Sequence, residues 1–251
     1  VLDKSGSISN TTIGNITLDG TGARFDGHGG DHGSSFTLNI INFTVNSSCG
    51  TGGNTWATLG VTRGNGSATV NITGDMNING SFVTGIWNGS GGVAGKGTGN
   101  FALNVTGTFS QSAGTFYGIY SIEGTAPFDG GISTMNIGAL NFTGGTFIVH
   151  YACHTDADGT VTLNVTNNCT VSFAASGNIF RIVGLSVLGG GTIENSAAMK
   201  FKVGGDLTIS GNASAEFLSN GGNRAEHDTI VGNLTISGGT NSFNYGVAGQ
   251  T

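Results

Sequence analysis

The chain has 251 residues, of which 48 are glycine and one is proline, and 9% are charged. So much glycine excludes a helix-rich protein, because each glycine in a helix costs roughly 1 kcal/mol, and the scarcity of proline excludes collagen. The hydrophobic fraction of 37% and the net charge of −6 exclude a charged disordered tail. With 8 Lys and Arg against 14 Asp and Glu, we expect no nucleic-acid partner. No apolar run reaches the roughly 18 residues of a membrane helix, so we also expect no membrane insertion.

A short motif recurs along the chain: a small or polar residue, an apolar residue, Asn, and then Ile or Val. Successive copies lie 28 to 33 residues apart. Apolar and polar residues alternate in each copy, which predicts a half-buried strand with Asn and Thr on its outer face. An early relative lies at 13–18, clear copies at 37–40, 69–72, 102–105, 134–137 and 162–165, a degenerate copy at 200–203, and two near twins at 204–210 and 231–237.

A second motif recurs with the same period as the first. A small residue or Glu followed by Phe comes about ten to fifteen residues after the strand motif. Two motifs that recur together along the chain indicate a structural repeat rather than chance low complexity. The phenylalanines are Phe82, Phe116, Phe147, Phe173, Phe217 and Phe243.

These repeats predict an all-β fold, a right-handed parallel β-helix (β-solenoid) of about eight coils of 28–33 residues with Gly-rich loops. A sandwich or barrel also has many short strands, but it has no reason to repeat one strand pair at this spacing. We expect residues 1–251 to form a single β-solenoid domain, as a segment of a longer repeat protein or filament. The excess length of each coil is expected in loops such as 88–99 and 122–131. The predicted interior is an aliphatic ladder of Leu38, Val70, Leu103, Met135 and Leu163 beside a column of Phe82, Phe116, Phe147, Phe217 and Phe243.

The near-twin segments 204–211 and 231–240 resemble the repeats of large secreted surface proteins and adhesins of Bacteroidota-type bacteria. They are also similar, more loosely, to the β-helical stalks of haemagglutinin-like and autotransporter adhesins. The resemblance implies an extracellular, cell-surface or filament role. It implies no catalytic residues.

The chain has three cysteines, Cys49, Cys153 and Cys169, and no Cys-x-x-Cys pair that would indicate structural zinc. One interpretation is that they are buried free thiols. The alternative is a disulfide between Cys153 and Cys169, in keeping with an exported protein. Asp156 and Asp158, in the sequence Asp-Ala-Asp-Gly, could present two carboxylates to Ca²⁺, or the segment could be a simple turn.

Two Asp and two His are concentrated at Asp26, His28, Asp31 and His32. Paired carboxylates with a histidine in a groove could perform the acid–base chemistry of a polysaccharide-degrading β-helix enzyme, and the same histidines could bind a transition metal. The alternative is a surface loop without chemistry.

Fourteen Asn-x-Ser/Thr sequences are candidate glycosylation sites. Where no glycan is attached, we expect the outward Asn and Thr rows to form hydrogen bonds between coils. The candidates are Asn10, Asn15, Asn42, Asn46, Asn65, Asn71, Asn79, Asn88, Asn104, Asn141, Asn164, Asn168, Asn212 and Asn233.

The sequence therefore favours a non-enzymatic, extracellular structural or adhesive β-solenoid that acts as a stalk, filament subunit or surface-binding segment. Its expected partners are further repeats or copies stacked end to end, surface glycans or other cells. No cofactor is expected apart from the Ca²⁺ alternative. Two other functions remain open: a polysaccharide-degrading enzyme on the same scaffold, and an ice-binding solenoid that uses flat rows of Thr.

Overall fold

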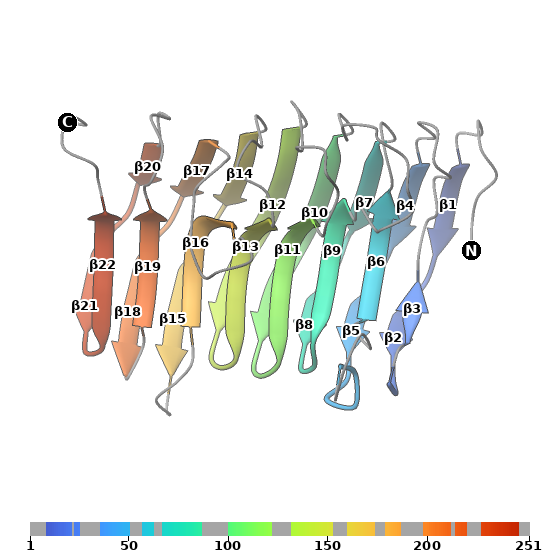
Figure 1. Cartoon of the computed structure of the whole chain (residues 1–251), viewed down its shortest axis with the longest axis horizontal. Helices are drawn as coiled ribbons and strands as arrows, with labels where there is room; N and C mark the ends of the chain where they lie inside the picture. Colours follow the sequence, from blue (N-terminus) through green and yellow to red (C-terminus); the bar gives the residue numbers. More distant parts are fainter. Residues whose placement is uncertain are drawn as a thin grey trace.

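In the computed structural model, β-strands form two sheets, and the paired strands of each sheet run parallel (Figure 1). It describes residues 9–21, 23–25, 36–50, 57–62, 67–86, 100–121, 132–152, 160–173, 179–186, 198–211, 214–219 and 227–245. Within these residues the larger sheet contains β1 (Ser9–Ile13), β2 (Ile16–Leu18), β4 (Phe36–Ile40), β5 (Phe43–Val45), β7 (Ala68–Ile72), β8 (Met76–Ile78), β10 (Phe101–Gln111), β12 (Ile132–Phe142), β14 (Thr160–Val165), β15 (Cys169–Phe173), β17 (Ala198–Val203), β18 (Leu207–Gly211), β20 (His227–Ile230) and β21 (Leu234–Ser237). The smaller sheet contains β3 (Arg24–Phe25), β6 (Ala57–Thr62), β9 (Phe82–Ile86), β11 (Thr115–Ser121), β13 (Thr146–Ala152), β16 (Ile179–Ser186), β19 (Ser214–Ser219) and β22 (Thr240–Tyr245).

Strands of each sheet follow one another in chain order along the long axis of the molecule, so that β1 and β22 lie at opposite ends (Figure 1). The chain passes through the larger sheet, crosses to the smaller sheet and returns one strand further along, so that each strand pairs in parallel with its equivalent in the next repeat. This arrangement is compatible with the predicted β-solenoid. In the described part of the chain, no segment forms a helix that could cross a membrane.

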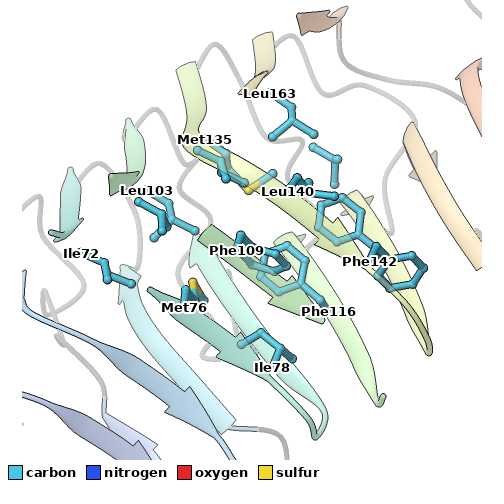
Figure 2. Close-up of a cluster of buried hydrophobic side chains, with 14 of the residues drawn as sticks. Ile72, Met76, Ile78, Leu103, Phe109, Phe116, Met135, Leu140, Phe142 and Leu163 are labelled. Atoms are coloured by element: carbon cyan, nitrogen blue, oxygen red, sulfur yellow. The ribbon is translucent and has the colours of Figure 1, made fainter. Parts of the chain in front are cut away.

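The predicted aliphatic ladder is confirmed. Its members are register partners in succession along the larger sheet, and Figure 2 shows three of them, Leu103, Met135 and Leu163, on neighbouring strands. Each fully buried Leu side chain contributes about 1.5–3 kcal/mol, so the repeated column is a principal source of stability. The column is Leu38, Val70, Leu103, Met135 and Leu163, each at most 1% exposed.

The aromatic column differs in part from the prediction. Phe116 and Phe147 do stack, with ring centroids 5.0 Å apart, but the next member is Phe180, whose ring lies 4.9 Å from that of Phe147. The backbone of Phe82 is in register with Phe116. Phe217 and Phe243 do not continue this column, because their backbone register places them opposite Ile182 and opposite each other.

Phe173, the remaining phenylalanine of that pattern, lies in the larger sheet, opposite Gly211. Because the segment between β15 and β16 is longer than the tight corner between β12 and β13, sequence spacing alone places the aromatic landmark of this repeat in the wrong sheet. Phe217 is displaced differently, because it lies two residues beyond Ala215, the register partner of Phe180.

Close stacking also explains part of the glycine content. Gly138 follows Ile137 at the bend of the larger sheet, where a Cβ atom would lie 2.1 Å from the carbonyl oxygen of Thr106 in the preceding repeat. Gly14 follows Ile13 at the equivalent bend of an earlier repeat, and among the described residues a Cβ atom there would meet nothing within 4 Å. Neither glycine has a left-handed backbone, so the difference between them arises from the neighbouring repeat alone.

We therefore predict opposite outcomes for two matched alanine substitutions. Gly138→Ala should lower the free energy of unfolding by about 1–3 kcal/mol, because the new methyl group overlaps backbone atoms that cannot move freely. Gly14→Ala should be neutral or stabilising by up to about 1 kcal/mol, because alanine restricts the unfolded chain. Urea unfolding of the two variants measures both effects, and equal stability of the two would contradict the stacked arrangement at this bend.

Candidate functional site

The most regular surface feature is a column of asparagine side chains on the outer face of the larger sheet. Each amide nitrogen donates a hydrogen bond to the amide oxygen of the equivalent asparagine one repeat earlier. Four consecutive bonds link five strands, with Nδ2–Oδ1 distances of 2.9, 2.9, 2.8 and 2.8 Å. The members of this amide ladder are Asn39, Asn71, Asn104, Asn136 and Asn164.

The outer face of these strands carries a second column, two residues before the ladder. It is threonine in four of the five strands, the exception being Ala102 in β10. Two residues along a strand span about 6.6 Å and neighbouring strands lie about 4.8 Å apart, so the two columns form a regular grid. The second column is Thr37, Thr69, Ala102, Thr134 and Thr162.

This Thr–Asn face, defined by the two columns on β4, β7, β10, β12 and β14, contains no ionisable side chain. On the next strand, β17, the equivalent positions are Lys200 and Lys202, so the uncharged face ends there. A neutral amide has two N–H donors and an oxygen with two lone pairs, and the ladder uses only part of this capacity. The face can therefore bind a neutral partner through repeated hydrogen bonds, in a manner independent of pH.

A second polar column lies at the bend within the larger sheet. The side-chain oxygen of an Asn or Asp accepts a hydrogen bond from a backbone N–H one repeat later, as Asn42 does from Asp75 at 2.9 Å and Asp206 from Asn233 at 2.7 Å. The same oxygen occupies the space that a Cβ atom would need at the glycine beside it, 2.4 Å from the Cβ position of Gly232. This contact explains why Gly-Asp and Gly-Asn pairs recur at the bend.

Within the described residues, Gln111 is the buried polar side chain of the interior. It is 1% exposed and stands in a column between Ile78 and Phe142. Its Nε2 donates hydrogen bonds to the carbonyl oxygens of Gly114 and Thr146, at 3.2 and 3.1 Å, whereas its Oε1 has no hydrogen-bond partner. Gln111 thus stabilises the corner that leads into β11, and its only sequence signal is a polar residue at an inward position.

The structure supports the interpretation that Cys49 and Cys169 are buried free thiols. Cys49 is 2% exposed and donates a weak hydrogen bond to the carbonyl oxygen of Leu18, at 3.3 Å. Cys169 is a buried free thiol in this structure, in an apolar column between Leu140 and Leu207. Its candidate disulfide partner, Cys153, lies outside the described residues, so the disulfide stays a prediction. Burial raises the pKa of both thiols above the ordinary value, so neither is an activated nucleophile.

Several predicted site residues lie outside the described part of the chain. These are the Ca²⁺ candidates Asp156 and Asp158, the disulfide candidate Cys153, and the segment 26–33 with its two Asp and two His. Among the residues that are described, no three His, Cys, Asp or Glu side chains come together as a metal site. Calcium binding and polysaccharide cleavage therefore stay predictions from the sequence.

The structure separates the glycosylation candidates by accessibility. Asn71 and Asn104 have an amide neighbour on either side along the ladder, and Asn164 has one on one side, which leaves little room for a sugar. The exposed candidates are Asn15, Asn141, Asn168 and Asn233; the half-buried ones are Asn42, Asn46, Asn71, Asn79, Asn104 and Asn164. Asn65, Asn88 and Asn212 lie outside the described residues, as does the side chain of Asn10 in β1.

Comparison of the chain with models of protein families, with curated proteins and with solved structures gives no match. The argument for function therefore depends on the chain's own residues, and above all on the Thr–Asn face.

We predict that the amide ladder contributes to stability. Asn104→Ala removes the hydrogen bond to Asn71 and the one from Asn136, each worth about 0.5–1.5 kcal/mol net. The free energy of unfolding should fall by about 1–2 kcal/mol. Asn141→Ala, at an exposed site outside the ladder, should change it by less than about 0.5 kcal/mol. Equal effects in a denaturant titration would show that the ladder bonds do not stabilise the fold.

Proposed function

We propose that this chain is an extracellular, non-enzymatic structural and adhesive segment, built as a right-handed β-solenoid of about eight coils. The handedness follows from the strong preference of parallel crossovers for the right-handed form. The extracellular location is supported by the resemblance of 204–211 and 231–240 to repeats of secreted surface adhesins. In this proposal the coil stack provides a stiff stalk, and its surface binds glycans of a cell or matrix.

The observation that supports this proposal is the Thr–Asn face. Its hydroxyl and amide groups are held at constant spacing by buried columns directly beneath them, for example Leu103 and Val105 beneath Asn104. Such a face loses little side-chain entropy on binding, because ladder hydrogen bonds already order the amides. Each hydroxyl or amide contact with a sugar is weak, but a polymer with repeated hydroxyl groups engages many of them at once.

The partners in this proposal are neutral polysaccharides of a surface and further repeats or copies stacked end to end. A neutral polymer is favoured over a charged one because the face has no ionisable group. Binding should therefore be insensitive to salt, unlike binding through charged residues.

The test is retention of the protein on insoluble neutral polysaccharides such as cellulose and chitin. The variant Thr69→Glu/Thr134→Glu places two carboxylates on the Thr–Asn face and should lower the bound fraction at least about tenfold, because several weak contacts are lost together. The matched control, Thr106→Glu/Thr166→Glu, carries the same charges at exposed bends beside the face and should bind like the wild type.

Two results would contradict the proposal. One is a binding result: either the wild type is not retained on the polysaccharide, or the Thr69→Glu/Thr134→Glu variant is retained as strongly as the wild type. The other is release of soluble sugar by the wild type, which would favour the polysaccharide-degrading alternative. Loss of that release in Asp26→Ala or Asp31→Ala would then assign the activity to segment 26–33.

Ice binding is a second candidate, favoured by one observation. Threonine appears irregularly along the sequence, but the strand register aligns Thr37 with Thr69 and Thr134 with Thr162 beside the amide ladder. A regular grid of hydroxyl and amide groups could order water molecules in a fixed lattice. If so, the wild type should show thermal hysteresis and the Thr69→Glu/Thr134→Glu variant should not. Equal freezing and melting temperatures for the wild type would exclude this function.

A further inference from the structure

The amide ladder keeps one donor and one acceptor free at each repeat. Among the described residues, Asn71, Asn104 and Asn136 each donate one hydrogen bond along the ladder and accept one. A primary amide has two N–H groups and an oxygen with two lone pairs, so each side chain retains one N–H and one lone pair. The ladder bond uses the N–H that lies opposite to the C=O group. The second N–H therefore points away from the Cβ atom and out of the sheet, beside the remaining lone pair of the oxygen.

This row of outward N–H and C=O groups restricts the chemistry of a ligand. A group that pairs with each ladder residue has to supply both an acceptor and a donor. A neutral amide or a hydroxyl group supplies both, whereas a carboxylate supplies acceptors alone and an ammonium group supplies donors alone. The Thr–Asn face also has no ionisable side chain that could neutralise a charged ligand. The complementary ligand is therefore neutral and carries amides or hydroxyl groups at a constant spacing.

The spacing of the ladder distinguishes an amide ligand from a hydroxyl ligand. Where amides stack by simple translation, their period is set by the N–H···O=C bond, whose N–O distances here are 2.8 to 2.9 Å, and by the width of the amide group. In solid polymers of N-acetylated sugars, acetamido groups of adjacent chains stack through this same bond. Their period therefore matches the separation of about 4.8 Å between neighbouring strands. A glucose polymer has no amide, so its chains are spaced by other contacts.

We propose that the Thr–Asn face binds the solid surface of an N-acetylated, β-1,4-linked polysaccharide. The acetamido groups of adjacent polymer chains pair with successive ladder asparagines, so that two amide ladders run side by side. Each polymer chain then crosses the face along the strand direction. The threonine column, about 6.6 Å from the ladder along each strand, contacts ring hydroxyl groups of the same chain. This inference rests on the proposed function and names the substrate class of that face.

Retention of the protein on insoluble chitin and on cellulose of equal surface area tests the proposal. The two solids share a β-1,4-linked backbone and differ in the acetamido group. The wild type should bind chitin at least about tenfold more tightly than cellulose, because several amide contacts form together.

Two matched variants identify the groups responsible for the preference. Asn104→Thr/Asn136→Thr replaces two ladder amides by hydroxyl groups and should bind both solids with affinities within about threefold of each other. The control Asn77→Thr/Asn141→Thr removes two outward amides of the same sheet outside the ladder, and it should keep the preference for chitin. Circular dichroism establishes that the variants keep the wild-type strand content. If the ladder variant does not fold, Asn164→Thr, which removes one ladder bond, replaces it and should reduce the preference at least about threefold.

The outcomes separate this inference from the proposed function. Equal retention of the wild type on the two solids, or stronger retention on cellulose, overturns the inference and leaves the proposed function in place. A preference for chitin that the ladder variant keeps, or that the control variant loses equally, also overturns the inference, because the ladder would then not be the recognising group. Absence of retention on both solids contradicts the proposed function and this inference with it.

Discussion

Parallel pairing of equivalent strands in constant register is the constraint on which this structure depends. It places each residue opposite its counterpart, so inward positions become apolar columns and outward positions become polar ones. The column of Leu103 and Met135 and the ladder of Asn104 and Asn136 are two sides of the same strand pair. A slip of one residue would turn asparagines inward and leucines outward, which penalises other registers strongly.

The same constraint relates the glycine content to function. At bends, backbone carbonyl groups and Asn or Asp side chains of one repeat lie where the next repeat would need a Cβ atom, as at Gly138 and Gly232. Segments that join the sheets can vary in length without disturbing the register of the larger sheet. A surface that is constant from repeat to repeat is suited to binding a partner that is itself repetitive.

Residue patterns predicted the parts of the fold that obey strict spacing. The aliphatic ladder and the outward Asn row follow from a motif whose internal spacing never changes, and both are confirmed. Phe217 and Phe243 were misplaced because they lie further along their strands: Phe217 is two residues beyond Ala215, the register partner of Phe180, and Phe243 is in register with Phe217. Gln111 gave no signal of its role, since its hydrogen bonds to carbonyl groups depend on a corner geometry that no short motif encodes.

Methyl NOE spectroscopy of the folded protein tests the stacked register most directly. The chain has three methionines, so a Met135→Leu variant assigns the Met135 methyl signal. The account predicts NOEs from that methyl group to the methyl groups of Leu103 and Leu163, which are register partners far away in sequence. A folded protein in which the Met135 methyl group contacts neither leucine would contradict the stacked arrangement and the surfaces inferred from it.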